Sequence, residues 1–307
     1  MADTDYDLVI IGAGPAGLTA GIYAARARMN VLLLEKAVPG GQILVTDWLE
    51  NYPGFPEGLT GFDLAEKMKK QAEQLGLKIE TAEVHSLNLS KTKKEIILKE
   101  KSITAKSLII ASGASPRNLG IGEEKFIGKG ISFCATCDGP FFKDKIVVAV
   151  GGGDTAVQES IFLTKFAKKV YLIHRRDELR ATKILQERIF ENDKIEIVWD
   201  SIATGIDGFF GVENVKIKNV KTDEEKTIKA DGCFIWVGIL PNTSFLNDSV
   251  KTDGAGFIQA DKNMQTSVPG VFAIGDVRDT PLRQVSTAVG DGAIAAVSAE
   301  HFVEGLN

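Results

Sequence analysis

Residues 6–17 read YDLVIIGAGPAG, an apolar run that ends in a glycine-rich turn. The run Tyr6–Ile11 is rich in β-branched residues, which predicts a buried strand of a parallel sheet. After the turn, the small residues from Pro15 to about Arg28 predict a helix. A second apolar run, Val31–Leu34, predicts the next strand. The stretch therefore predicts a strand–helix–strand unit and, with it, an α/β fold.

The turn has the spacing of a dinucleotide-binding fingerprint, with Gly12, Gly14 and Gly17 in a G-x-G-x-x-G pattern. The first glycine allows a tight turn, the second lets the backbone approach a pyrophosphate, and the third lets the helix pack on the strand. Glu35 ends the second strand, where a carboxylate is expected to bind ribose hydroxyls. A glycine turn of another α/β fold is the alternative, but the strand, helix and acid all have the required spacing. Because Glu35 would repel a 2′-phosphate, this site is predicted to prefer FAD or NAD over NADP.

The same pattern returns later in the chain. Lys145–Val150 predicts a strand, and Gly151-x-Gly153-x-x-Ala156 is the fingerprint in its G/A form. A helix is expected from Asp154 to about Lys165, followed by a strand at Val170–Ile173. The chain therefore contains two nucleotide-binding units.

The second unit lacks the ribose-binding acid. In the first unit, Glu35 lies 23 positions after Gly12. The residue 23 positions after Gly151 is His174, and the basic residues that follow it are Arg175, Arg176 and Arg180. A guanidinium group binds phosphate with a planar set of N–H donors, so this unit is predicted to bind NADPH, with His174 shaping the site. The alternative is a solvated run of charges at the start of a helix.

A cysteine pair, Cys134-Ala135-Thr136-Cys137, precedes the second unit and is followed by Asp138. A zinc site needs four ligands, and a c-type haem needs a histidine after the second cysteine, so both fit poorly. Two reduced buried cysteines are a further alternative. In a chain that binds two dinucleotides, the pair is best interpreted as a redox dithiol.

Asp138 has two possible roles. Its carboxylate can shuttle a proton during dithiol chemistry, provided that burial raises its pKa. It can also cap a helix by accepting backbone N–H groups, and both roles can hold at once. The remaining cysteine, Cys233, lies in an apolar strand and is predicted to be buried and inert, while His85 and His301 look incidental. No metal site is expected.

Bulk composition narrows the class of protein. The 307 residues suggest two domains, and 44% hydrophobic with 25% charged residues is ordinary for a globular protein. The net charge of −5 argues against a nucleic-acid binder. The first residues, 1–5, do not look like a secretory signal, and no apolar run reaches the roughly 18 residues of a membrane span. We therefore expect a cytoplasmic protein that does not bind membranes.

Several segments connect the units. Residues 86–103 predict β-rich, charged and exposed structure, while 111–118 and 238–243 are rich in glycine, proline and serine and are natural linkers. Near the C-terminus, Val271–Ile274 predicts a strand, and a helix of small residues is expected from about Thr287 to Phe302.

These motifs, in this order and over essentially the whole chain, resemble those of the low-molecular-weight thioredoxin reductases. The matching stretches are GAGPAG at 12–17, GGQ at 40–42, ASGASPR at 111–117, CATCDG at 134–139, GGGDTA at 151–156, HRRDELRA at 174–181, GDVR at 275–278 and RQVSTAVGDG at 283–292.

The resemblance implies two Rossmann-like domains of the three-layer ββα type, the second inserted in the first. Residues 1–115 and 245–307 would form the FAD-binding domain, and residues 116–244 the NADPH-binding domain with the redox pair. It also implies cofactor-binding residues, some of them in the motifs above. Those for FAD are Gly12, Gly14, Pro15, Ala16, Gly17, Glu35, Lys36, Gly41, Gln42, Asn51, Ala111, Gly113, Gly275, Asp276, Arg283, Gln284 and Val285. Those for NADPH are Gly151, Gly153, Asp154, Thr155, Ala156, His174, Arg175, Arg176 and Arg180.

The activity implied is reduction of thioredoxin by a homodimer, with electrons passing from NADPH through FAD to the cysteine pair. By resemblance, Cys137 faces the flavin, Cys134 attacks the thioredoxin disulfide, and Asp138 is the acid–base carboxylate. The family rotates its inserted domain between two pairings, and the joints near Ala114–Pro116 and Ile239–Pro241 are the expected hinges.

One departure from the family pattern is Gln158-Glu159-Ser160, which replaces a common Glu-Glu pair and is expected to leave the chemistry unaffected. The alternative functions are a related flavoprotein with another protein acceptor, an enzyme that takes electrons from ferredoxin, and a flavin-binding redox sensor. Reductases of alkyl hydroperoxide systems carry an additional N-terminal domain, for which a first strand at Tyr6 leaves no room. The intact arginine set disfavours the ferredoxin-fed enzyme and the sensor.

Overall fold

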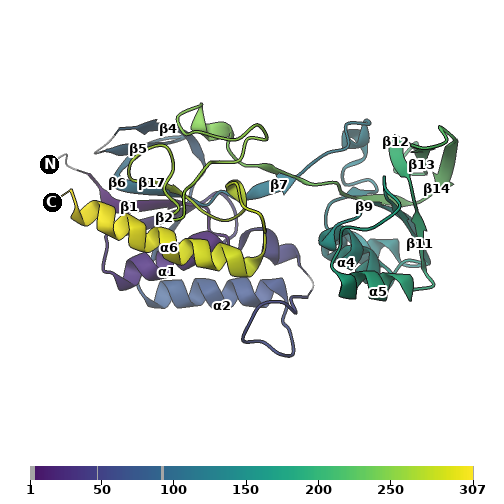
Figure 1. Cartoon of the computed structure of the whole chain (residues 1–307), viewed down its shortest axis with the longest axis horizontal. Coiled ribbons are helices and arrows are strands. Elements are labelled where there is room, and N and C mark those ends of the chain that lie inside the picture. The colour runs from purple at the N-terminus through teal and green to yellow at the C-terminus, as the bar shows by residue number, and fades with distance from the viewer. Residues whose placement is uncertain (1–3, 47, 91–92, 307) are drawn as a thin grey trace. The chain divides into compact units, whose positions relative to one another are not determined.

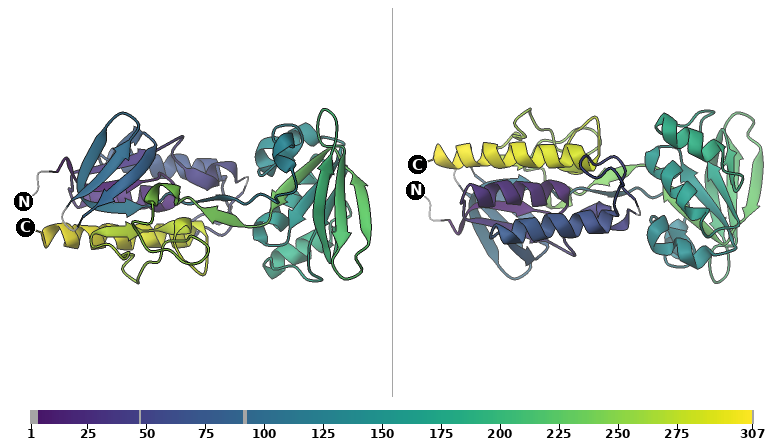
Figure 2. Two further views of the ribbon diagram at one scale, coloured as in Figure 1. Left: turned by 90° about the horizontal axis from the view of Figure 1, so that it is seen from above. Right: turned by 90° about the horizontal axis from the view of Figure 1, so that it is seen from below.

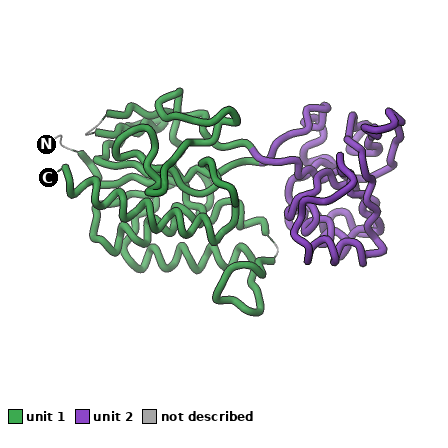
Figure 3. Tube along the Cα trace, viewed as in Figure 1, with its two compact units in different colours: residues 1–115, 240–307 green, residues 116–239 purple. Residues whose placement is uncertain are grey.

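The computed structural model describes residues 4–46, 48–90 and 93–306. The chain divides into two compact units (Figure 3): unit 1 comprises residues 1–115 and 240–307, and unit 2 comprises residues 116–239. The second boundary therefore lies five residues earlier than the 244/245 position expected from the sequence. Within the expected first domain, residues 1–3, 47, 91–92 and 307 lie outside the described residues. Which nucleotide each unit binds stays a prediction.

A mixed seven-stranded sheet forms the centre of unit 1. Its parallel strands are β3 (Lys78–Thr81), β2 (Val31–Glu35), β1 (Tyr6–Ile11), β6 (Ser102–Ile110) and β17 (Val271–Ala273). The antiparallel strands β5 (Lys94–Leu98) and β4 (Val84–Leu89) continue from β6. This order brings β17, from the C-terminal part of the chain, next to β6.

Helices cover one face of this sheet. They are α1 (Pro15–Arg26), α2 (Gly61–Gln74) and α6 (Val285–Glu304), which lie side by side (Figures 1 and 2). In β1, Leu8 and Ile10 join the core under the helices, whereas Val9 and Ile11 join a second core on the other face. Burial on both faces explains why the β1 sequence is apolar throughout rather than alternating.

The structure corrects one expectation for residues 86–103. Lys94, the first residue of β5, is fully buried rather than exposed. Its Nζ donates to the carbonyl of Ser90 at 2.7 Å and lies 5.4 Å from the Phe302 ring centroid. Burial lowers the pKa of Lys94 to about 8. The alternating side-chain direction of a strand, and not the charge of the residue, sets this position.

Unit 2 repeats the architecture with a five-stranded parallel sheet. In spatial order its strands are β11 (Ile195–Val198), β10 (Lys169–Ile173), β9 (Ile146–Gly151), β15 (Gly232–Trp236) and β8 (Ile131–Ser132). Helices α4 (Asp154–Leu163) and α5 (Lys183–Phe190) cover one face, as Figure 1 shows. The antiparallel strands β12 (Ser201–Asp207), β13 (Asn214–Asn219) and β14 (Glu225–Lys229) form a separate three-stranded sheet.

The side chains of β9 divide between two cores as those of β1 do. Val147 and Ala149 face the core with α4, while Val148 and Val150 face the core that includes residues of the three-stranded sheet. Helices, parallel sheet and antiparallel sheet thus make three layers. The predicted fold class, two Rossmann-like units with the second inserted in the first, is confirmed.

The two joints named as hinges are short strands, β7 (Ala114–Pro116) and β16 (Ile239–Pro241), which pair in a two-stranded sheet. Their role as hinges stays a prediction. Among the described residues, no helix has the length and apolar character needed to cross a membrane.

Candidate functional site

The glycine turn after β1 has the geometry that the fingerprint predicts. Gly12 has a φ of +102°, and a Cβ there would overlap the carbonyl oxygen of Ala111. A Cβ on Gly17 would overlap the carbonyl oxygen of Gly12. Both positions therefore require glycine, one for backbone conformation and close approach and the other for helix packing.

Glu35 fixes this turn through its carboxylate. One oxygen accepts the N–H of Ala13 at 2.8 Å, and the other accepts the N–H of Ala37 at 3.0 Å. The carbonyl of Ala13 in turn accepts the N–H of Gly40 at 2.8 Å. Because each carboxylate oxygen can accept more than one hydrogen bond, Glu35 retains capacity for ligand hydroxyls.

The N-terminus of α1 opens beside this turn. Gly14 is its N-cap, no side chain caps the helix, and Pro15 is its first residue. The first backbone N–H groups of a helix have no partner within it, so these are available to an anion. A Cβ on Gly41 would lie 3.0 Å from the Cα of Gly14, which places the short helix η1 (Gly41–Val45) against the same turn.

Distant segments complete the set of residues in unit 1. Gln42 donates through Nε2 to the carbonyl of Ala114 at 3.2 Å. Asn51 donates to the Oε1 of Gln284 at 3.0 Å, which connects the loop after η1 to the start of α6. A Cβ on Gly275 would lie 3.1 Å from the Cβ of Ala16, so the loop after β17 contacts the first turn of α1.

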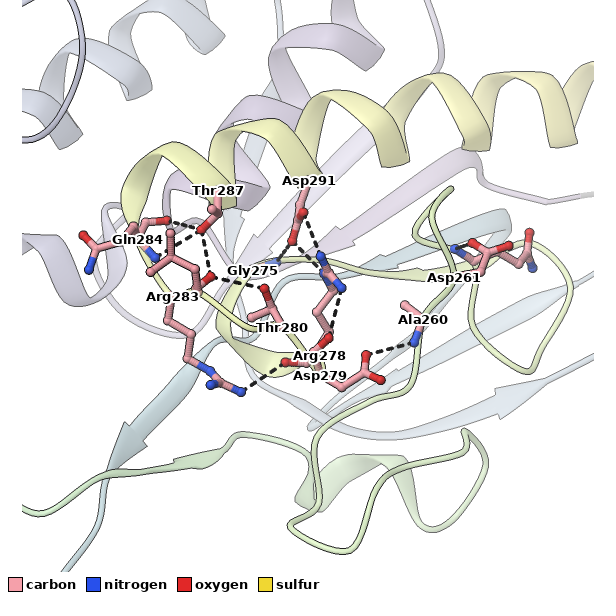
Figure 4. A network of polar contacts seen from close by, with 12 residues as sticks. Ala260, Asp261, Gly275, Arg278, Asp279, Thr280, Arg283, Gln284, Thr287 and Asp291 are labelled. Atoms are coloured by element: carbon pink, nitrogen blue, oxygen red, sulfur yellow. Dashed lines mark hydrogen bonds and ion pairs between the residues drawn. The ribbon is translucent and has the colours of Figure 1, made fainter. Parts of the chain in front are cut away.

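Gln284 is also the N-cap of α6. A capping box joins Gln284 and Thr287. The Thr287 hydroxyl accepts the N–H of Gln284 at 3.1 Å and donates to its carbonyl at 2.9 Å (Figure 4). This capping box extends α6 two residues before its predicted start and fixes the position of Gln284.

A partly buried ion pair supports the loop after β17. Arg278 donates to both carboxylate oxygens of Asp291, at 2.8 and 3.1 Å, and Asp291 also accepts the N–H of Gly275 at 3.0 Å (Figure 4). Arg278 and Asp291 lie in two of the family-like stretches, but the sequence indicates no role for either. Nothing in their spacing indicates that they pair.

Asp276 lies on the short helix η5 (Gly275–Val277). Burial raises the pKa of its carboxyl group, and the negative charge of Asp291 raises it further, while Arg283 acts in the opposite direction. Arg283 itself stacks on Phe257 with its Cζ 4.1 Å from the ring centroid and donates to the carbonyl of Arg278 at 3.4 Å. This part of the site is therefore charged but poorly hydrated.

The remaining predicted FAD residues occupy nearby backbone positions. Lys36 directly follows Glu35 and is exposed, Ala111 is buried against Gly12, and Val285 is the first residue of α6. Gly113 has a φ of +65°. The structure thus gathers the predicted residues around the carboxyl ends of β1, β2, β6 and β17, where open α/β sheets bind ligands.

The second glycine turn follows β9 in unit 2. Gly153 is the N-cap of α4, whose first residue is Asp154, and no side chain caps the helix. A Cβ on Gly153 would meet no protein atom within 4 Å, so the backbone is open to a ligand there. Asp154 accepts the N–H of Thr182 at 2.7 Å, which holds the loop before α5.

His174 packs beneath this turn. A Cβ on Gly152 would overlap its ring, and its Nε2 is 2.9 Å from the carbonyl of Glu178. Burial lowers the pKa of His174 despite hydrogen bonds to the backbone of Glu178 and Gly151, and Arg180 and Arg176 lower it further. The ring is therefore held neutral and supports the loop.

Arg175, Arg176 and Arg180 are exposed around the end of β10. The N–H of Arg180 donates to the carbonyl of Gly152 at 2.7 Å, which ties this segment to the glycine turn. Within the part of the chain that the structure describes, no carboxylate forms an ion pair with these three guanidinium groups. Their charge is thus available to an anionic ligand.

The cysteine pair forms a disulfide, Cys134–Cys137, at the short helix α3 (Ala135–Asp138). Cys134 is the N-cap, and its sulfur accepts the N–H of Cys137 at 3.0 Å. Cys137 is exposed and Cys134 is half-buried. The disulfide contradicts the alternative of two reduced buried cysteines.

Two further predictions concern neighbours of this pair. Asp138 is half-buried and precedes the turn η3 (Gly139–Phe142), but its side chain makes no cap hydrogen bond there, so the capping role is not supported. Cys233 is fully buried, and burial raises its thiol pKa to about 12, which agrees with an inert residue.

The sequence reasoning missed the role of Glu159 in α4. Its carboxylate is buried and accepts the N–H of Ala135 at 3.1 Å, directly after Cys134. Among the described residues, no group of three or more His, Cys, Asp or Glu side chains is arranged to hold a metal ion.

Comparison with known proteins gives a consistent result. The family model described as pyridine nucleotide-disulphide oxidoreductase matches residues 6–292. A thioredoxin reductase of Bacillus subtilis is 44% identical over 98% of this chain and 96% of its own length. The crystal structure of Lactococcus lactis thioredoxin reductase superimposes with a TM-score of 0.96 at 46% identity, over 98% of this chain and 100% of that one. The crystal structure of T. acidophilum thioredoxin reductase gives a TM-score of 0.93 at 38% identity, over 99% of this chain and 100% of that one.

Proposed function

The chain belongs to the pyridine nucleotide-disulphide oxidoreductase family, and on that basis we propose that it is an NADPH-dependent thioredoxin reductase with FAD as its flavin. The observation that carries the proposal is the Cys134–Cys137 disulfide next to a dinucleotide-binding turn in the same unit. The chain is an oxidoreductase with flavin and nicotinamide sites, whereas the identity of each cofactor and of the acceptor belongs to the proposal.

The residues of unit 1 fit FAD. The uncapped N-terminus of α1 and the close approach allowed by Gly12 and Gly14 suit a pyrophosphate. Glu35 would accept ribose hydroxyls, and it disfavours a 2′-phosphate there. Gly275, Asp276 and the Arg283–Val285 segment would bind the remainder of the cofactor.

Unit 2 fits NADPH. The open backbone at Gly153 and the uncapped N-terminus of α4 suit a second pyrophosphate. Arg175, Arg176 and Arg180 supply guanidinium groups that form no ion pair among the described residues, which suits the 2′-phosphate. Those same residues argue against ferredoxin as the donor, because such an enzyme has no use for a phosphate site.

Bound NADPH and FAD would supply hydride and electron-pair transfer. The protein supplies the dithiol. The Cys134 thiolate would attack the thioredoxin disulfide and form a mixed disulfide, and Cys137 would then attack Cys134 to release the thioredoxin dithiol and restore the Cys134–Cys137 bond. Asp138 would hold or release the proton that this exchange requires.

Steady-state oxidation of NADPH by the purified flavoprotein, with and without thioredoxin and with NADH in parallel, tests the proposal. Thioredoxin-dependent turnover that strongly favours NADPH and disappears in Cys134→Ser is the expected result. Reduction of the flavin by NADPH without thioredoxin turnover would point to another protein acceptor. If neither nucleotide reduces the flavin, the NADPH site is wrong and a ferredoxin-type donor becomes the better hypothesis.

We also propose a homodimer, on the resemblance to the family. Sedimentation equilibrium of the FAD-loaded protein should give twice the chain mass of 33.1 kDa, and a single species of the chain mass would contradict it. The cytoplasmic location expected from the sequence stays a prediction.

A further inference from the structure

A buried carboxylate lies at the start of the redox helix. Glu159 is 8% exposed, and its Oε2 accepts the N–H of Ala135, the first residue of α3. Ala135 is itself fully buried and follows Cys134 directly. The charge of Glu159 is therefore fixed beside the peptide that carries the Cys134 sulfur, in surroundings with little water to screen it.

The backbone around Cys134 favours a thiolate there. The sulfur of Cys134 accepts the N–H of Cys137 at 3.0 Å, and the free N–H groups at a helix start lower the pKa of a cysteine in this position. Glu159 acts in the opposite direction. It occupies the first of these N–H groups and adds a negative charge, which raises the free energy of a neighbouring thiolate.

Among the described residues of α3, α4 and η3, the charged side chains are all carboxylates. On α3 itself the only titratable neighbour is Asp138; α4 carries Asp154 and Glu159, and η3 carries none. Asp154 is at the first turn of α4, where it binds the N–H of Thr182. Glu159 is thus the charge on α4 that is bonded to the redox helix.

We propose that Glu159 is a positioning residue that disfavours the thiolate form of the reduced pair and so keeps the Cys134–Cys137 dithiol a strong reductant. Reduction breaks the S–S bond with two electrons and takes up one proton to give a thiol and a thiolate, or two protons to give two thiols. A group that destabilises the thiolate shifts this equilibrium towards the disulfide, and the reduced pair gives up its electrons more readily. The proposal rests on the proposed reductase function, because a strong reductant is what a disulfide acceptor requires.

The test compares the FAD-loaded native protein with Glu159→Gln, whose amide oxygen can still accept the Ala135 N–H. Each protein is equilibrated in mixtures of reduced and oxidised dithiothreitol from about pH 6 to about pH 9, a range that includes the ordinary thiol pKa of about 8.5. The free thiols are then alkylated and counted by mass spectrometry. The rate of alkylation of Cys134 by iodoacetamide against pH gives its pKa directly. Neither measurement needs thioredoxin turnover, so a failure of this proposal can be told apart from a failure of the proposed reductase function.

In Glu159→Gln we expect the Cys134 thiol pKa to fall by about one unit, and the equilibrium with dithiothreitol to shift about tenfold, roughly 30 mV, towards the reduced form. The shift should be absent at low pH, where both proteins hold two thiols, and should grow as the pH rises through the thiol pKa. A purely conformational effect of the substitution would move the dithiol–disulfide equilibrium equally at every pH.

Glu159→Met, which removes the charge with a side chain of similar length, gives a second neutral variant if glutamine is not tolerated. Glu159→Asp keeps the charge and should retain the native pH dependence. Glu187→Gln neutralises an exposed carboxylate on α5 and is the matched control, expected to change neither quantity. An unchanged thiol pKa in both neutral variants, or a shift that is the same at all pH values, would overturn the proposal.

Discussion

At Asp276, requirements of binding and of stability act against each other. Burial raises the pKa of this carboxyl group, so its ionised form is costly in the folded protein without cofactor. A folded pKa above the unfolded value means that the native state binds more protons, and stability then falls as the pH rises from the ordinary value of 3.8 through the folded pKa.

We therefore expect Asp276→Asn to stabilise the FAD-free protein at pH 7 by up to about 1 kcal/mol, while it weakens FAD binding. Thermal unfolding of the FAD-free proteins measures the first effect, and fluorescence titration with FAD measures the second. The stability difference should shrink below the folded pKa, where the native carboxyl group is protonated. A variant that is less stable than the native protein at pH 7 would contradict this account of Asp276.

Arg176 allows a prediction about nucleotide choice. Arg176→Gln should raise the KM for NADPH about 10- to 100-fold, because a charged hydrogen bond to the 2′-phosphate is lost. The kcat/KM for NADH should change little, since NADH has no 2′-phosphate. Arg176→Lys should give an intermediate loss, and Lys183→Gln, an exposed change on α5, serves as the control. Equal losses with both nucleotides would show that Arg176 supports the loop rather than the phosphate.

At the scale of single elements, the short helix η2 (Glu123–Phe126) is held by a carboxylate. Glu123 is fully buried and accepts the backbone N–H groups of Leu119, Gly120 and Ile121, the last two at 2.8 Å each. Burial by itself would raise the pKa of Glu123, but these N–H groups outweigh it and lower the pKa. The loop before η2 thus depends on one ionised side chain.

Glu123→Gln should lower the free energy of unfolding by about 2–3 kcal/mol at pH 7, because the charge is lost and the amide NH₂ cannot accept the N–H groups that face it. The midpoint of urea unfolding measures the change. Since the folded pKa is depressed, the stabilisation is present above the ordinary value of 4.5 and is lost as the pH falls through the folded pKa. Glu124→Gln, exposed and adjacent, should change stability by less than about 0.5 kcal/mol, and an equal loss in both variants would exclude this role of Glu123.

For the whole molecule, unit 2 is one continuous segment with cores on both faces of its own sheet. Its two ends are close, since the N–H of Arg117 donates to the carbonyl of Gly238 at 2.9 Å. An inserted segment with these properties is expected to fold by itself.

The isolated segment 116–239 should therefore unfold cooperatively and bind 2′,5′-ADP more tightly than 5′-AMP. Circular dichroism during urea unfolding and isothermal titration calorimetry test the two statements. Binding should be lost in the Arg176→Gln segment without loss of folding. A segment that lacks a cooperative transition would show that unit 2 depends on unit 1.

The sequence alone determined the two strand–turn–helix units and the chemistry of the Cys134–Cys137 pair. These features are encoded over short distances, because each apolar run, glycine turn or CxxC pair is recognised within a stretch of about 30 residues. Comparison of equivalent positions in the two units likewise showed that His174 stands where the first unit has the acid Glu35.

Only the tertiary structure decided which distant side chains meet. The pairing of Arg278 with Asp291, the burial of Lys94 under Phe302 and the bond from Ala135 to Glu159 join residues whose separation in the chain carries no signal. Asp138 shows the converse, since its residue type suited a cap hydrogen bond that its side chain does not make. Such contacts depend on how helices and sheets pack, and packing is fixed by the whole hydrophobic core rather than by any local pattern.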